Sequence, residues 1–251
     1  MKLTTLDLNA DLGETVNDYL ELLPVITTAN VACGGHAGGG ELLKQTVQAC
    51  VESNVQVGAH PSYPDRENFG RMSLRDKFSK VELTVLISEQ IKLVLDELAT
   101  HGKHLSHVKA HGALYNDAMV HQGVAEALID AVKPFGVSIF GLPNSTLQSV
   151  ASESGVTFIP EGYMDRAYTN QGTLVPRSMP GAVLEHAASL DQIEQLAITG
   201  TVVAIDGSVL ELNLRTICIH ADTPDAGNTA RAVRHLLESN GISIQHFEAC
   251  L

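Results

Sequence analysis

Residues 5–14 read TLDLNADLGE, and this stretch shows the pattern that decides the fold. Apolar and polar residues alternate through it, which predicts a β-strand over Thr5–Asn9. Two carboxylates, Asp11 and Glu14, follow at once. A strand that runs directly into ionisable side chains recurs along the chain, so we expect several such units in one sheet.

Short apolar runs of strand length alternate with segments of helical periodicity. One helical stripe has apolar residues at positions 83, 87, 91, 94 and 98, and others lie within residues 43–51 and 226–237. Alternation of this kind predicts a parallel sheet covered by helices. The other predicted strands are Ile26–Ala32, Val55–Ala59, His107–Ala110, Val137–Leu142, Thr157–Pro160, Val202–Ile205 and Thr216–Ile219.

The alternation runs through all 251 residues, and no linker rich in Pro, Gly or Ser divides them. Because (β/α) barrels fill about 250 residues as one unit, we expect a single α/β domain over residues 1–251, with the barrel closed by parallel strands. Two long polar segments, Pro61–Asp76 and Arg166–Met179, are interpreted as functional loops. The segment Val202–Arg215, with a turn signal at Asp206-Gly207, predicts a hairpin before the last barrel strand.

Composition excludes several classes of function. The net charge of −13 argues against a nucleic-acid binder, which would carry a basic face. No apolar run reaches the roughly 18 residues of a membrane span, and the first residues lack the apolar run of a signal peptide. The four cysteines form no CxxC pair. We therefore expect a soluble cytoplasmic protein without a disulfide framework or a structural zinc site.

Ionisable side chains stand at the ends of most predicted strands. The carboxyl ends of parallel strands meet at one face of a barrel, where active sites are built, so these side chains are predicted to converge on one cleft. Six strands contribute to this set. The set comprises Asn9, Asp11, Glu14, Asn30, His36, His60, Asp65, Arg66, Lys109, His111, Tyr115, Asn116, Glu161, Asp165, Arg166, His220 and Asp222.

The chemistry of the individual acids and imidazoles stays open at this stage. Asp11 and Glu14 suit a general acid and base, or ligands to a hard cation, but a turn carboxylate and a helix-start charge would look the same. The four histidines that follow strands favour a functional role as a set, although any one of them alone would be a common hydrogen-bonded core residue. These histidines are His36, His60, His111 and His220.

The cationic side chains are candidate ligands for anions. Lys109 lies in an apolar strand, where an ammonium needs a carboxylate, a phosphate or a polarised carbonyl as partner. The arginines of the long loops could hold carboxylate or phosphate bidentately, or could simply be solvated; they are Arg66, Arg71, Arg166 and Arg177. Glycines in residues 33–40, including Gly38, could let backbone N–H groups approach a phosphate, or could serve a tight turn; no Walker motif occurs in the chain.

Long motifs in this order resemble those of the LamB/YcsF family, which comprises the A subunit of bacterial 5-oxoprolinase. The resemblance spans nearly the whole chain, and its motifs are uncommon. They are DLNADLGE (7–14), TANVACGGHAG (28–38), VGAHPSYPDRENFGR (57–71), VKAHGALYN (108–116), EGYMDRAY (161–168), GTLVPR (172–177) and TICIHADTP (216–224).

The resemblance implies an enzyme that opens 5-oxoproline to L-glutamate with ATP, and with Mg²⁺, together with separate B and C subunits. It also implies an irregular, seven-stranded (β/α) barrel similar to the glycoside hydrolase/deacetylase barrel. Homo-oligomers are compatible with it. Carried onto this sequence, it assigns catalytic roles to Asp11, Glu14, His60, Lys109 and His111. Substrate or phosphate binding is assigned to His36, Asp165, Arg166, His220 and Asp222, and the residue types above add Gly38 and Arg66 to this binding set.

Two alternatives belong to other classes of protein. A metal-dependent deacetylase or amidohydrolase would use a carboxylate and histidines from different strands, with Asp11, His36 and His60 as candidate ligands. A subunit that only binds substrate would leave the chemistry to a partner. Residue types alone do not separate these three possibilities.

Overall fold

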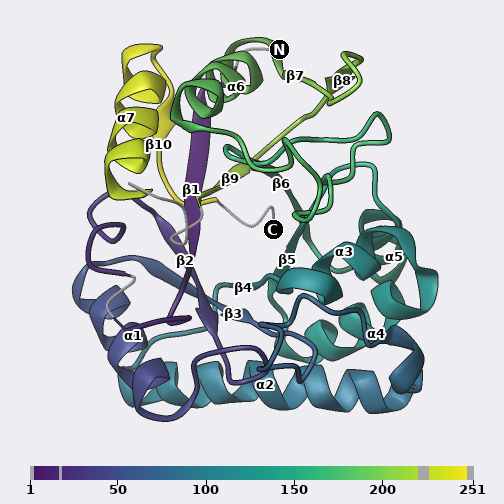
Figure 1. Cartoon of the computed structure of the whole chain (residues 1–251). Helices are drawn as coiled ribbons and strands as arrows, with labels where there is room; N and C mark the ends of the chain where they lie inside the picture. Colours follow the sequence, from purple (N-terminus) through teal and green to yellow (C-terminus); the bar gives the residue numbers. More distant parts are fainter. Residues whose placement is uncertain (1–2, 17–18, 220–225, 248–251) are drawn as a thin grey trace.

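The computed structural model describes residues 3–16, 19–219 and 226–247. Seven parallel strands close into a barrel, in the order β1-β2-β3-β4-β5-β6-β9 and back to β1 (Figure 1). This confirms the predicted seven-stranded α/β barrel. The barrel strands are β1 (Thr5–Leu12), β2 (Thr28–Ala32), β3 (Gln56–His60), β4 (His107–Val108), β5 (Ser138–Gly141), β6 (Phe158–Tyr163) and β9 (Thr216–Ile219).

Helices surround the barrel because each buries one apolar stripe against it. In α2 the predicted stripe at positions 83, 87, 91, 94 and 98 is fully buried, and the helix starts in a capping box between Ser79 and Glu82. The helices are α1 (Gly40–Glu52), α2 (Lys80–Thr100), α3 (Gly112–Val120), α4 (Gln122–Val132), α5 (Thr146–Ser154), α6 (His186–Thr199) and α7 (Ala226–Ser239), with the 3₁₀ turns η1 (Arg75–Lys77) and η2 (Lys133–Phe135). Within the described ranges, no helix is long and apolar enough to cross a membrane.

Two small elements lie outside the barrel wall. The predicted hairpin is present: β7 (Thr201–Val203) and β8 (Val209–Glu211) pair antiparallel in a sheet of their own. The predicted strand Val202–Ile205 therefore corresponds to β7 of this hairpin and not to a strand of the barrel. The short strand β10 (Ser243–Ile244) pairs with the start of β1, which the sequence did not reveal because two residues carry no detectable periodicity.

Two barrel strands are longer than predicted, and the added residues belong to the site. β1 continues past Asn9 to Leu12, and β6 continues past Pro160 to Tyr163. Side chains alternate between the two faces of a strand, so Asn9 and Asp11, like Glu161 and Tyr163, share one face. That face is the barrel interior, where polar contacts across the barrel make polar residues compatible with a continuous strand.

The interior is polar in successive layers. In the layer nearest the start of β1, Asp7 accepts hydrogen bonds from the hydroxyls of Thr27, Thr28 and Thr216. In the next, the ring of His107 fills space that Gly58 leaves open, since a Cβ at Gly58 would lie 2.4 Å from that ring. The barrel centre is therefore held by hydrogen bonds between strands as well as by apolar packing.

Replacing Asp7 by Asn should remove a pH dependence of stability. Burial raises the pKa of Asp7 from 3.8 to about 6, against the opposing effect of its hydroxyl donors. The folded protein then holds this proton more tightly than the unfolded chain, so stability falls as pH rises from about 4 to about 6. A pKa difference of this size corresponds to on the order of 3 kcal/mol. Urea unfolding from about pH 4 to about pH 7 should show that extra fall in the wild type, whereas parallel curves would contradict it.

Candidate active site

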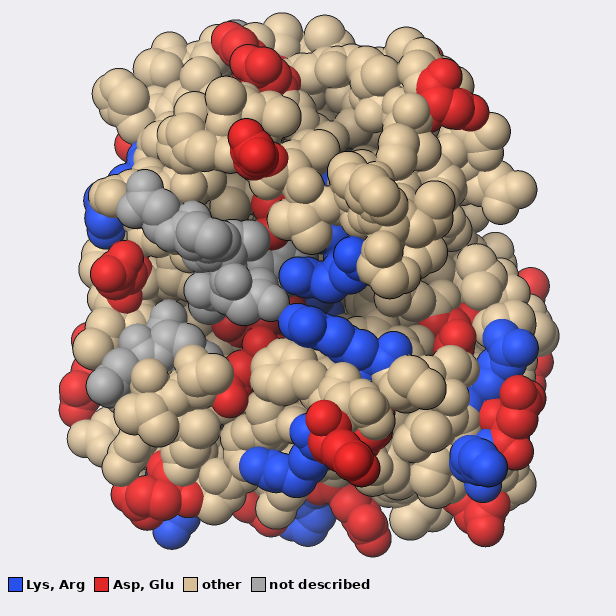
Figure 2. Space-filling view, viewed as in Figure 1, with Lys and Arg blue, Asp and Glu red and all other residues tan. Residues whose placement is uncertain are grey.

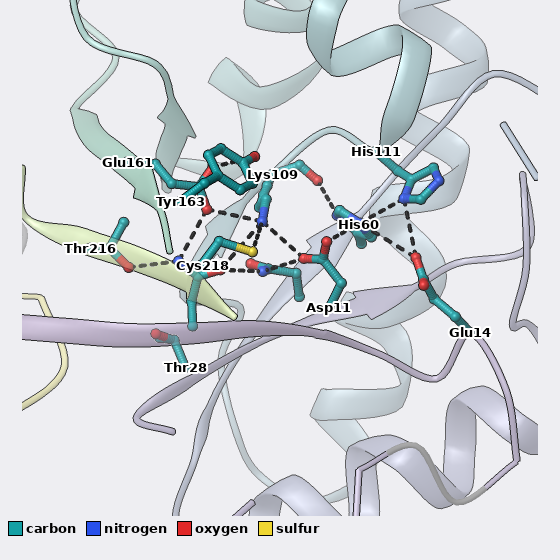
Figure 3. A network of polar contacts seen from close by, with 12 residues as sticks. Asp11, Glu14, Thr28, His60, Lys109, His111, Glu161, Tyr163, Thr216 and Cys218 are labelled. Atoms are coloured by element: carbon teal, nitrogen blue, oxygen red, sulfur yellow. Dashed lines mark hydrogen bonds and ion pairs between the residues drawn. The ribbon is translucent and has the colours of Figure 1, made fainter. Parts of the chain in front are cut away.

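The ammonium of Lys109 lies at the centre of a buried network inside the barrel (Figure 3). Its Nζ is 3.0 Å from Asp11 Oδ1 and 2.9 Å from Glu161 Oε1, and it donates to Cys218 Sγ at 2.9 Å. Burial alone would lower the pKa of Lys109, but the negative charge around it, Asp11 foremost, raises that pKa well above its usual range. The side chain is therefore a fixed positive charge at neutral pH.

Two asparagines hold the carboxylates of this network in place. Asn9 Nδ2 donates to Glu161 Oε1 at 3.1 Å and to Thr216 Oγ1 at 2.7 Å. Asn30 Nδ2 donates to Asp11 Oδ1 and to Asn9 Oδ1, each at 2.8 Å. A third donor, the Tyr163 hydroxyl, reaches Glu161 Oε2 at 3.0 Å. Strands β1, β2, β6 and β9 are thus joined across the barrel by side chains.

Beside this network, Glu14 lies among three imidazoles. Its Oε1 is 2.9 Å from His36 Nε2, 3.1 Å from His111 Nδ1 and 3.9 Å from His60 Nε2. The rings of His36 and His111 stack with centroids 3.6 Å apart. Asp11 links this acid–imidazole cluster to the lysine network, because its Oδ2 lies 3.4 Å from His60 Nε2 while its Oδ1 contacts Lys109.

The pKa directions in the cluster describe a charged acid beside neutral rings. Burial would raise the pKa of Glu14, but its contacts with the imidazoles of His111 and His36 lower it well below the usual range. Burial lowers the pKa of His36 to about 4 and also lowers that of His111, against the opposing effect of Glu14. At neutral pH, Glu14 is ionised, and the rings of His36 and His111 carry no charge.

A cleft of about 450 Å³ opens above both groups. Its floor includes all five residues predicted to be catalytic: Asp11, Glu14, His60, Lys109 and His111. Arg71, Arg166 and Arg177, from the two long loops, also line it. Figure 2 shows Lys and Arg side chains gathered near the middle of one face of the molecule. The cleft therefore combines a floor of acids and imidazoles with guanidinium groups suited to an anion.

Several predicted binding residues do not line this cleft. Arg66 is turned onto the glycine-rich segment, donating to the carbonyls of Gly34 at 2.9 Å and of Gly38 at 3.3 Å. Gly38 lies in a tight turn where the backbone passes close to Ala32, since a Cβ at Gly38 would lie 2.5 Å from Ala32 O. Asp165 is buried and is not among the lining residues. His36 contacts Glu14 from behind the lining, and His220 and Asp222 lie outside the described residues.

The structure also places in the site residues to which the sequence assigns no role. Glu161 stands at a predicted strand end without a function, and neither Tyr163 nor Cys218 belongs to the predicted set. The signal that could find them is the two-residue strand period: Tyr163 follows Glu161 on one face, and Cys218 follows Thr216. Arg71 and Arg177, which the sequence offers only as two of four candidate loop arginines, line the cleft as well.

The possible ligand atoms in the cleft indicate which of the predicted cofactors these residues could hold. Mg²⁺ prefers oxygen ligands and retains several waters, so the imidazoles around Glu14 do not suit it. Asp11 and the arginines are better matched to a magnesium–phosphate ligand entering from the cleft. Imidazole nitrogens with a carboxylate suit a transition-metal ion instead.

The fold and site together define an α/β barrel protein with a charged catalytic-type cleft at the carboxyl ends of its strands. Residues 6–251 match the model of the LamB/YcsF family. One of the proteins named as the A subunit of 5-oxoprolinase, from Agrobacterium fabrum, is 40% identical over 253 residues, covering 98% of each chain. The chain therefore belongs to the LamB/YcsF family, as its motifs indicated.

Solved structures agree with this assignment. The lactam utilization protein from Thermus thermophilus matches with a TM-score of 0.89 at 35% identity, over 97% of this chain and 100% of that one. A family 4 carbohydrate esterase from Streptomyces lividans matches with a TM-score of 0.51 at 13% identity, over 99% and 95% of the two chains. The second likeness concerns the fold alone and bears out the predicted similarity to deacetylase barrels.

Replacing Lys109 by Met should destabilise the protein by about 3–5 kcal/mol, because Asp11 and Glu161 would be left as buried carboxylates without their cation. The matched control is Lys92→Met on α2, whose exposed ion pair with Asp96 is worth less than about 1 kcal/mol.

Urea unfolding of both variants measures the difference. The deficit of the Lys109 variant should shrink on acidification, since carboxylates that lose a cation take up protons more readily in the folded state. Equal losses for the two variants would show that the buried ion pairs do not stabilise the barrel.

Proposed function

We propose that this chain is the A subunit of a 5-oxoprolinase, which opens 5-oxoproline to L-glutamate in a reaction coupled to ATP hydrolysis. The observation that carries the proposal is the cleft itself, in which three arginines face a floor of carboxylates, imidazoles and one lysine. The names of the curated relatives and of the Thermus structure support it, because a 5-oxoprolinase acts on a lactam.

5-Oxoproline has two groups that its enzyme must act on or bind, a carboxylate and a lactam amide. 5-Oxoproline carries a carboxylate, for which guanidinium groups are the preferred partners, and Arg71, Arg166 and Arg177 line the cleft. Arg166 is held by its own loop, donating to Val175 O at 2.6 Å and to Ala182 O at 3.2 Å. A guanidinium fixed in this way keeps its orientation when an anion binds.

The lactam amide is the second group, and it has to be activated before water can open the ring. Resonance makes the ring C–N bond resistant to water, as it does in a peptide. Transfer of the γ-phosphoryl group of ATP to the lactam oxygen removes that resonance and releases ADP. Water then adds to the ring carbon, the C–N bond breaks, and phosphate leaves the resulting acyl centre as a second water is taken up. The products are L-glutamate, ADP and phosphate. Mg²⁺ would accompany the nucleotide phosphates.

The floor of the cleft would supply the proton transfers. Asp11, His60 and His111 are each candidates for accepting a proton from the attacking water. Asp11 is best placed, since it joins the lysine network to the imidazoles. Lys109 would offset negative charge on the phosphorylated oxygen. Because the sequence has no Walker motif, we assign nucleotide binding to the assembly with the B and C subunits.

Replacing Asp11 by Asn should lower the rate of glutamate formation by at least about 100-fold in the complex reconstituted with the B and C subunits, because Asn cannot accept the proton. The measurement is 5-oxoproline-dependent release of ADP and glutamate. The control is Asp96→Asn, at a 58% exposed carboxylate on the outer face of α2, which should retain full activity.

The same assay tests the wider proposal. Release of ADP only in the presence of 5-oxoproline and both partners is the expected result. Glutamate formation by this chain alone, without ATP, would replace the proposal with an ATP-independent amide hydrolase. Full activity of the Asp11 variant would remove that carboxylate from the mechanism and leave this chain with a binding role.

A further inference from the structure

His60 and His111 turn ring nitrogens toward each other, with His60 Nε2 3.0 Å from His111 Nδ1. The other nitrogen of each ring faces a backbone carbonyl: His60 Nδ1 is 2.8 Å from Lys109 O, and His111 Nε2 is 3.0 Å from Phe69 O. A carbonyl can only accept, so each ring carries a proton on that outer nitrogen. The two inner nitrogens therefore face one shared space, which a proton or a metal cation would fill.

The separations match a first coordination shell. Ligand atoms about 2.1 Å from a shared ion, at tetrahedral or octahedral angles, lie about 2.9–3.4 Å apart. The two ring nitrogens are 3.0 Å apart, and Glu14 Oε1 is 3.1 Å from His111 Nδ1. The 3.9 Å between Glu14 Oε1 and His60 Nε2 corresponds to a wider ligand–ion–ligand angle.

The surroundings have the features of a metal site. The carbonyls that accept from the outer nitrogens of His60 and His111 are the usual partners of metal-bound imidazoles, since they fix the ring and its tautomer. His36 stacks on His111 and contacts Glu14 Oε1 through Nε2 at 2.9 Å. Its buried Nδ1 has no hydrogen-bond partner among the described residues, so its one proton belongs on Nε2, where it orients Glu14.

The charge balance also favours a cation here. Lys109 pairs with Asp11 and Glu161, whereas Glu14 contacts the imidazoles of His36 and His111. Asp11 Oδ2 also faces this space, 3.4 Å from His60 Nε2. A dication between these groups would offset both carboxylates.

We infer that Glu14, His60 and His111 bind one transition-metal dication of the Zn²⁺ class, with an open coordination position toward the cleft. All three residues line the cleft, which provides a path of entry and room for a water or substrate oxygen as fourth ligand. Two imidazoles and a carboxylate select such an ion over Mg²⁺ or Ca²⁺. His36 is a positioning residue for Glu14. This inference concerns binding and does not rest on the reaction proposed above. With the ion bound, the inner ring nitrogens of His60 and His111 are occupied, so Asp11 is the one of the three candidates that remains to accept a proton.

The test is titration of the chelator-treated full chain with Co²⁺, whose visible absorption reports tetrahedral nitrogen and oxygen ligands, together with metal analysis after dialysis against Zn²⁺. One ion per chain is expected. His60→Ala and His111→Ala should each weaken binding by more than about 100-fold, and His36→Ala by about 10–100-fold. His104→Ala, at an exposed histidine outside the cleft, should leave it unchanged.

Thermal unfolding of every variant without metal shows whether it folds, and a Zn²⁺-dependent rise in Tm should be seen in the wild type and the His104 variant. Lack of Co²⁺ absorption in the folded wild type would overturn the inference and assign a shared proton to the imidazole pair. Wild-type affinity in both folded His60 and His111 variants would overturn it as well.

Discussion

The ammonium of Lys109 is buried near the middle of a closed barrel, within 3.0 Å of carboxylate oxygens from β1 and β6. Such a charge is almost wholly withdrawn from water, and its desolvation is compensated by partners that are themselves fixed. Asn9, Asn30 and Tyr163 hold those partners, and each of them comes from a barrel strand. The barrel has to close with this register for the ion pairs to form, so the fold and the site depend on the same contacts.

The two carboxylate oxygens of Asp11 contact two different groups of residues. Oδ1 belongs to the lysine network, while Oδ2 faces His60 and the acid–imidazole cluster. A ligand entering the cleft therefore meets a fixed positive charge on one side of this carboxylate and imidazoles on the other. Such a floor suits a reaction in which one oxygen gains negative charge while a water loses a proton.

The two long loops complete the site that the barrel begins. The loop after β3 brings Arg71, and the loop after β6 brings Arg166 and Arg177. Their guanidinium groups stand over the floor, so anion binding and proton transfer are supplied by different parts of the chain. This division is typical of barrel enzymes, in which strands position the catalytic side chains and loops determine the ligand.

Much of the architecture follows from local sequence patterns. Strand and helix periods are local, so the alternation that defines the barrel, and the polar residues at its strand ends, are visible in stretches such as residues 5–14. Asp11, Glu14, His60, Lys109 and His111 are predictable for that reason, and the long motifs identify the family.

The sequence does not predict which side chains contact each other across the barrel. Lys109 meets Glu161, and Glu14 meets His111, across separations of 52 and 97 positions that no local period encodes. Arg66 and Arg166 look alike in their loops, yet one binds the carbonyls of a glycine turn and the other lines the cleft. Closure of the barrel determines these side-chain contacts, because only the closed barrel sets which strands face each other and which loop reaches the cleft.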